Sequence, residues 1–161
     1  MRKMIKRADL CDTKTVRAIT EQTINSVYPK YYPKGAVEFF LSHHNENNIK
    51  NDIEKGIVYI LYENDNAVGT VTVKENEILR LFVLPQFQGK GCGGRLLDFA
   101  EKKAAENYSK IIIDASLPAK PIYLKRGYVF TEYHTIETDN GDFLCYDVME
   151  KKYKILAENR I

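Results

Sequence analysis

The sequence predicts a mixed α/β fold of the α+β kind, in which one sheet begins antiparallel and ends with a parallel crossover and a C-terminal hairpin. Three apolar runs between Gly56 and Pro85 are separated by short polar turns, which indicates an antiparallel meander. A glycine-rich turn and a helical pattern then lead to another apolar run at 110–114, as in a strand–helix–strand crossover. Asn140-Gly141 between two later apolar runs is a strong hairpin signal. We expect helices on both faces of this sheet.

A short strand at 4–8 and two or three helices precede the meander. Asp12 can cap the first helix through its side-chain oxygen, and Pro29 and Pro33 interrupt the helical pattern after it. Each helix is indicated by apolar residues that recur at helical spacing. These are Val16, Ile19, Thr23 and Val27 in the first helix, Val37, Phe40 and Leu41 in the second, and Ile49 and Ile53 in a third.

The remaining elements follow in order along the chain. The meander strands are expected at 57–62, 68–73 and 78–83, and a helix begins near Arg95. After the strand at 110–114, a short helix near 119–126 leads to hairpin strands at 128–136 and 143–149. No linker or internal repeat is visible, so we expect a single domain over 1–161.

Composition narrows the class of protein. The net charge is +2, from 24 basic and 22 acidic residues, which favours neither nucleic acid nor a membrane as a partner. Cys11, Cys92 and Cys145 are widely spaced and form no C-x-x-C pair, which suits a reducing, cytoplasmic location and no metal site. His43 and His44 are adjacent and cannot face one site together on a helix, so we expect packing or surface roles.

Four glycines follow the third meander strand and indicate an anion site. Gly89, Gly91, Gly93 and Gly94 let a ligand approach the backbone N–H groups, and the helix start adds partial positive charge. Gly89-x-Gly91-x-x-Gly94 also matches a dinucleotide fingerprint, with Asp114 where a ribose-binding carboxylate would stand. That alternative is weaker, because the motif lies past mid-chain and only 47 residues follow Asp114 (161 minus 114).

A second pattern, Gln88-x-x-Gly91-x-Gly93, is set between an apolar strand and Leu96-Leu97. In this pattern and in its order of elements the chain resembles the GNAT superfamily of N-acetyltransferases. The resemblance implies that acetyl-coenzyme A binds with its pyrophosphate on the loop and its pantetheine arm along the preceding strand. The implied cofactor-binding residues are Leu81, Phe82, Val83, Gln88, Gly89, Lys90, Gly91, Cys92, Gly93, Gly94 and Ser116.

The resemblance also implies catalytic roles. Tyr123 in Ala119-x-x-x-Tyr123-x-x-x-Gly127-Tyr128 occupies the position of the family's general acid, although a ring that only packs beneath the cofactor is the alternative. Glu77 resembles a glutamate that some members use as general base, or it is the solvated end of a turn. The N–H of Leu81 is a candidate to polarise the thioester carbonyl, unless its strand is fully paired.

Two departures from the family pattern affect the next segment. Ser116 stands where many members have an asparagine, and it reaches less far toward a cofactor. Pro118 and Pro121 crowd the start of the short helix, which we therefore expect to begin late. Lys120, Lys125 and Arg126 could meet phosphates or could form a solvated basic face.

The acceptor is expected in a groove between the first two helices and the final hairpin. Carboxylates and tyrosine faces there suit a cation, so the predicted reaction is direct transfer of an acetyl group to a small or peptide primary amine in a ternary complex. A non-catalytic acyl-coenzyme A sensor is the alternative, and the protein is expected to be a monomer or homodimer. Cys92 is expected to point into helix packing. Candidate groove residues are Tyr28, Tyr31, Tyr32, Glu132, Tyr133, Glu137, Asp142 and Tyr146.

Overall fold

The structure of the protein, a computed structural model, describes residues 2–154. A seven-stranded sheet has the order β1-β2-β3-β4-β5-β7-β6. Within the described residues β4 and β5 pair in parallel and every other neighbouring pair is antiparallel, which confirms the predicted fold class. The strands are β1 Lys3–Arg7, β2 Val58–Glu63, β3 Asn66–Lys74, β4 Glu77–Val83, β5 Lys110–Ala115, β6 Val129–Glu137 and β7 Phe143–Lys152.

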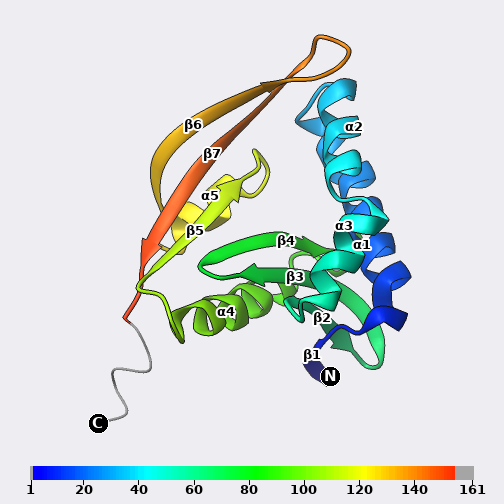
Figure 1. Cartoon of the computed structure of the whole chain (residues 1–161), viewed down its shortest axis with the longest axis vertical. Helices are drawn as coiled ribbons and strands as arrows, with labels where there is room; N and C mark the ends of the chain where they lie inside the picture. The colour runs from blue at the N-terminus through cyan, green and yellow to red at the C-terminus, as the bar shows by residue number, and fades with distance from the viewer. Residues whose placement is uncertain (1, 155–161) are drawn as a thin grey trace.

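Helices cover both faces of the sheet, as expected (Figure 1). Leu96, Leu97 and Ala100 of α4 pack with Val71 and Ile113 in the larger core, and α1 and α2 form a second core on the other face. In this part of the chain no helix is both long enough and apolar enough to span a bilayer. The helices are α1 Thr13–Val27, α2 Lys34–His43, α3 Glu46–Glu54, α4 Cys92–Ala105 and α5 Lys120–Lys125.

Three helix starts test the sequence predictions. Asp12 does not cap α1, because its side chain accepts the N–H of Asp9 at 2.9 Å in a reciprocal capping box around a 3-10 turn. Helix α4 begins at Cys92, earlier than the predicted Arg95, because Gly91 is left-handed (φ 84°) and already serves as the N-cap residue. Helix α5 begins late, at Lys120, and holds Pro121 in its first turn, as predicted.

Strands β4 and β5 form a fork. Their Cα pairing is confined to Glu77 with Ile112 and Ile78 with Ile113, although β4 continues to Val83 and β5 to Ala115. Beyond these pairs the two strands diverge, and Figure 1 shows β5 rising away from β4. The edge of β4 that faces β5 is therefore open over its second half.

A β-bulge lies in that same half of β4. Thr72 pairs with Leu79 and Thr70 with Phe82, so one residue of β3 opposes Arg80 and Leu81. Arg80 has φ 47°, an uncommon left-handed conformation for a residue with a long side chain. The bulge changes the direction of the β4 backbone at Leu81.

The C-terminal hairpin arches away from the sheet and returns to α2 (Figure 1). At its tip, Asp142 Oδ2 accepts the backbone N–H of Gly35 at 2.8 Å, and Asn140 Nδ2 donates to the same carboxylate oxygen at 2.9 Å. The N-cap residue of α2 is Pro33, which forms no side-chain cap. Asp142 therefore supplies the cap from a distant part of the chain and closes the hairpin onto the helix.

Candidate active site

The glycine turn between β4 and α4 is open. Gly89 and Gly91 have φ of 73° and 84°, and a Cβ built on either glycine meets no atom within 4 Å. Arg95 donates its backbone N–H to Gly91 at 3.1 Å, so the N–H groups of the preceding helical residues have no intrahelical partner. Such a turn is suited to an anion, and its own side chains do not fill it.

Three predicted cofactor residues have structural partners around this turn. Gln88 donates its side-chain amide to the Val83 carbonyl at 2.9 Å and so braces the turn against the end of β4. Lys90 is exposed, and its carbonyl accepts Lys3 Nζ at 3.1 Å. Cys92 is 1% exposed and its thiol lies 3.8 Å from the Glu63 carboxylate, which confirms that it points into the packing beneath α4.

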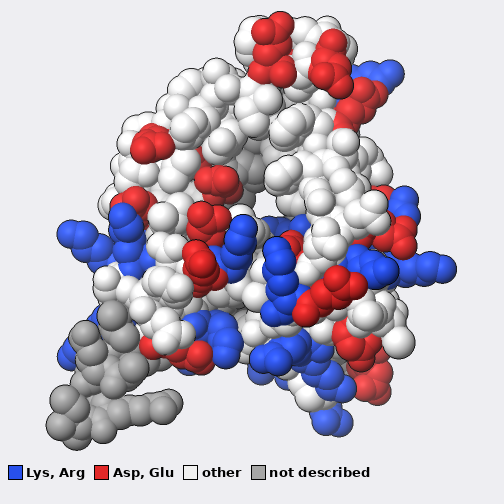
Figure 2. Space-filling model, viewed as in Figure 1, with Lys and Arg blue, Asp and Glu red and all other residues white. Residues whose placement is uncertain are grey.

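A cavity of about 420 Å³ lies against the fork, on the side of α2 and α3. Leu81 and Phe82 from β4, Ser116 after β5 and Tyr123 from α5 all line it. Figure 2 shows this face of the molecule hollowed between the hairpin and the helices, with acidic and basic side chains around the lower rim. The fork, the bulge and the predicted catalytic tyrosine thus meet in one space.

Tyr123 is buried and packs 5.6 Å, centroid to centroid, from Tyr128. Burial, with a smaller effect of Tyr28, raises the pKa of the Tyr123 hydroxyl, so the phenol stays protonated across the neutral range. A thiolate that forms in the same desolvated space has its conjugate acid pKa raised for the same reason. Burial therefore raises the pKa of the Tyr123 phenol and the pKa of the thiol together. Their match does not depend on the ordinary tyrosine pKa near 10.

Glu77 and Asp114 stand on the same face of the sheet but at different ends of the fork. Ile78 and Ile113 pack into the core beneath α4, so their alternating neighbours point to the opposite face. Glu77 is exposed on the paired side of the fork, whereas Asp114 lies beyond the last pair and lines the cavity. The role of Glu77 as base stays a prediction.

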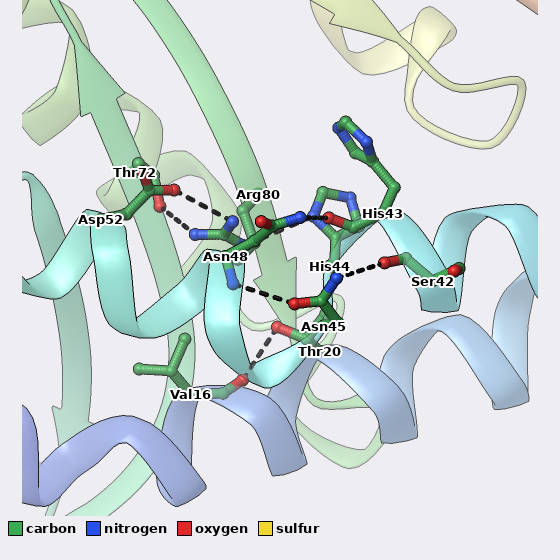
Figure 3. A network of polar contacts seen from close by, with 10 residues as sticks. All are labelled: Val16, Thr20, Ser42, His43, His44, Asn45, Asn48, Asp52, Thr72 and Arg80. Carbon is green, nitrogen blue, oxygen red and sulfur yellow. Dashed lines mark hydrogen bonds and ion pairs between the residues drawn. The ribbon is translucent and has the colours of Figure 1, made fainter.

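A buried polar network that was not expected from the sequence lies behind the bulge (Figure 3). The Arg80 guanidinium, with a side chain 5% exposed, donates to Asp52 Oδ2 and to Thr72 Oγ1, both at 3.1 Å. Its Nε donates to His44 Nδ1 at 3.4 Å, which requires a neutral His44 ring. An arginine inside the apolar run 78–83 was the available signal, since a charge is rarely buried without a partner.

His44 is thus a packing residue, whereas His43 is exposed at the surface and also lines the cavity. Burial, the positive charge of Arg80 and the nearby His43 lower the pKa of His44 to about 3. The His43 ring points away from Arg80 (Figure 3) and lines the cavity. In residues 2–154 no three metal-binding side chains gather closely enough to hold an ion.

The predicted acceptor groove needs correction. Tyr28 and Tyr146 line the cavity, but Asp142 is engaged in the contact with α2, and Tyr32 accepts the N–H of Leu117 at 2.7 Å. The remaining predicted groove residues are exposed on the hairpin or the loop before α2 and do not line the cavity. They are Tyr31, Glu132, Tyr133 and Glu137.

Two of the basic residues considered for phosphate binding already have acidic partners. Lys120 pairs with Asp147, and Arg126 pairs with Asp98 and with Glu101, whose side chain is 2% exposed. Glu101 also accepts the Tyr128 hydroxyl at 3.1 Å. The contacts of Glu101 tie α4 to the segment after α5. The ion pairs balance the positive charges of Lys120 and Arg126 without a ligand.

Comparison with known proteins agrees with this architecture. The sequence profile of the acetyltransferase (GNAT) domain matches residues 19–148. The chain is 28% identical over 92 residues to the uncharacterized N-acetyltransferase YafP of Escherichia coli K12, a match that covers 57% of this chain and 59% of YafP.

Solved structures share the fold. A GCN5-related N-acetyltransferase from Rhodopseudomonas palustris superposes with a TM-score of 0.86 at 24% identity, over 94% of this chain and 96% of that one. The PaiA N-acetyltransferase of Thermoplasma acidophilum, solved with coenzyme A, has a TM-score of 0.74 at 21% identity, over 95% and 100%. With a domain profile that spans most of its length, this chain belongs to the GNAT acetyltransferase family.

Proposed function

We propose that this protein transfers the acetyl group of acetyl-coenzyme A to a primary amine by direct attack in a ternary complex. The observation that supports the proposal best is the fork, in which β4 and β5 pair at two positions and then part beside an open glycine turn. The coenzyme A complex of the PaiA protein is consistent with the choice of cosubstrate.

The cosubstrate would lie along the open edge of β4. The backbone N–H groups from Gly89 to Gly94 would hold its diphosphate, as at other helix N-termini. Leu81 and Val83, whose backbone groups point to the same edge of β4, would pair with the pantetheine arm as an added strand would, and Ser116, which lines the cavity, would face that arm across the fork. Gln88 and Cys92 would support the turn through Val83 and the core beneath α4.

The chemical step needs few groups. The amine nitrogen attacks the thioester carbonyl and forms the C–N bond, while the N–H of Leu81 beside the bulge stabilises the oxyanion. As the C–S bond breaks, the thiolate takes the Tyr123 hydroxyl proton, and the phenolate regains a proton that leaves the former amine. One further proton, from the ammonium form of the acceptor, is released before attack.

Binding and turnover test the proposal separately. Acetyl-coenzyme A should raise the melting temperature and NAD should not, because only a ligand that prefers the native state stabilises it. Turnover is then measured as free thiol released with a panel of small and peptide amines. Tyr123→Phe should lower kcat by about 10²-fold or more with unchanged affinity for acetyl-coenzyme A.

These outcomes also distinguish the proposal from a non-catalytic acyl-coenzyme A sensor. A sensor would show the same thermal shift but no thiol release with any amine. Stabilisation by NAD in place of acetyl-coenzyme A would contradict both functions.

A further inference from the structure

Asp114 is the carboxylate nearest the open side of the fork. If the register of β4 and β5 is continued past Ile78 and Ile113, Asp114 stands level with Leu79. Glu77 stands level with Ile112, so Asp114 lies about 7 Å further toward the open end, at about 3.3 Å per residue. The cavity that Leu81 and Tyr123 line also takes in Asp114.

The Asp114 carboxylate is available for a ligand. Among residues 2–154 no hydrogen bond or ion pair engages it, whereas the other cavity carboxylate, Asp52, is committed to Arg80. Desolvation raises the pKa of the Asp114 carboxyl, an effect that His134 and His43 oppose. The Asp114 side chain is exposed where it lines the cavity, so a ligand can reach its charge, and no close partner neutralises that charge.

Aromatic and titratable side chains surround Asp114 in the cavity, which Lys55, Lys74 and the paired Arg80 also line. His43 of α2 and His134 of β6 act on it electrostatically, and burial, with smaller effects of Asp114 and Glu132, raises the pKa of Tyr146 on β7. Tyr146 and Phe39 line the same cavity, where Tyr146 stacks on His134 and Phe39 stacks on His43. A carboxylate with aromatic neighbours is a favourable environment for a cation.

We propose that Asp114 binds the ammonium of the acceptor and takes its first proton. The inference rests on the acetyl transfer proposed above and adds the residue that selects and activates the acceptor. It moves the catalytic carboxylate from the start of β4, where sequence resemblance suggested Glu77, to the strand across the fork.

The proton balance is simple. The acceptor R–NH₃⁺ donates one proton to the Asp114 carboxylate and becomes R–NH₂, whose lone pair then attacks the acetyl carbonyl. Asp114 returns this proton to water at the mouth of the cavity. A carboxyl whose pKa is raised toward the working pH accepts a proton more readily than an ordinary aspartate.

The test compares Asp114→Asn with Glu77→Gln, which remove one charge each with little change in shape. With a productive amine, we expect Asp114→Asn to lower kcat/KM for the amine by about 10²-fold or more, with unchanged affinity for acetyl-coenzyme A. We expect Glu77→Gln to lower kcat/KM by a smaller factor than Asp114→Asn does. The acid limb of the pH profile of kcat/KM should be lost in Asp114→Asn and kept in Glu77→Gln.

A second variant separates chemistry from folding. Asp114→Ala should regain amine acetylation when acetate is added, which a purely structural defect would not do. Retention of the acid limb in Asp114→Asn, or a loss smaller than about tenfold, would overturn the inference and leave the proposed function intact. A wild-type protein that binds acetyl-coenzyme A but acetylates no amine would overturn the proposed function, and this inference with it.

Discussion

Asp142 Oδ2 accepts the backbone N–H of Gly35 at 2.8 Å, across 107 positions of sequence. Through this hydrogen bond the last hairpin caps α2, whose own N-cap residue, Pro33, makes no side-chain cap. The contact also fixes the far wall of the cavity, because Tyr146 and Leu144 of β7 face Phe39 and Phe40 of α2 there. The shape of the acceptor site therefore depends on one short hairpin tip.

Gly35→Ala should open this contact. A Cβ on Gly35 would lie 1.9 Å from Asn140 Oδ1 and 2.6 Å from Thr138 Oγ1, so the tip must move away. We expect the free energy of unfolding to fall by about 1–3 kcal/mol and KM for the amine to rise. Chemical denaturation and initial rates measure the two effects.

Asp142→Asn is the matched control. The amide oxygen can still accept the Gly35 N–H, so only the interaction of the charge with the helix dipole is lost, about 0.3–1 kcal/mol. If Gly35→Ala left both stability and KM unchanged, the hairpin tip would not be in contact with α2.

The left-handed residue at the start of α4 gives a second prediction. Gly91→Ala must adopt φ near 84°, which costs an L-residue about 1–2 kcal/mol, although its side chain would meet open space. We expect a loss of that size in the free energy of unfolding. Binding of acetyl-coenzyme A should weaken as well, because the turn must relax from its open form.

Gly94→Ala is the comparison for this turn. Gly94 lies inside α4 at an ordinary helical φ, and a Cβ there would approach Arg126 Nη1 at 3.8 Å, an ordinary contact. Alanine is favoured over glycine in a helix by up to about 1 kcal/mol, so this variant should be at least as stable as the wild type. Equal stability of Gly91→Ala and the wild type would contradict the assigned backbone conformation.

The sequence predicted the order of elements because each signal was local. Apolar runs between short polar turns marked the strands, Asn140-Gly141 marked the hairpin, and Pro121 correctly delayed the start of α5. The glycine turn was also readable, since Gly89 and Gly91 take conformations that other residues avoid. The boundaries of the elements differed from the prediction. Helix α4, for example, begins at Cys92 and not near Arg95, because Gly93 and Gly94 belong to the helix.

The fork and the acceptor site could not be predicted in the same way. At the bulge, Arg80 contacts Asp52 and Thr72, which are distant in sequence or on another strand, and no local pattern marks where β4 and β5 part after Ile78. The hairpin likewise commits Asp142 to α2 and carries Glu132 away from the cavity. A strand pattern gives the alternation of side chains but not how far two strands stay paired.

The Arg80–Asp52 ion pair gives a third prediction. Asp52→Ala would leave the guanidinium buried behind the bulge without its anion, and such losses cost about 3–5 kcal/mol. The bulge should relax as well, so acetyl transfer should fall even in the protein that remains folded. Urea denaturation measures the loss in the free energy of unfolding, and initial rates at saturating acetyl-coenzyme A measure the loss of acetyl transfer.

An exposed pair provides the control. Arg17 and Glu21 lie 2.7 Å apart on α1, with both side chains more than 40% exposed. Glu21→Ala should therefore cost no more than about 1 kcal/mol. Similar losses for Glu21→Ala and Asp52→Ala would mean that the pair behind the bulge is not buried in solution.

His44 makes the fold sensitive to acid. Its ring accepts the Arg80 Nε–H, so protonation would remove the acceptor and place two positive charges side by side. Its pKa is about 3 in the folded protein against 6.5 for an unperturbed histidine. The unfolded chain thus binds the proton more readily, and the contribution of His44 to stability is complete above pH 6.5 and declines as the pH falls toward 3.

Urea denaturation of the wild type and His44→Asn between about pH 7.5 and 5 measures this dependence. Asparagine can keep an acceptor for Arg80 but cannot titrate, so the variant should lose less stability on acidification than the wild type. The difference between the two proteins should be at most about 1.4 kcal/mol per pH unit below 6.5. The His43 ring points away from Arg80 (Figure 3), and His43 makes the smallest contribution to the lowered pKa of His44, so His43→Asn should change the slope less than His44→Asn does. Identical slopes for the wild type and His44→Asn would show that His44 is not held neutral, and the hydrogen bond that joins α2 to the bulge would have to be reassigned.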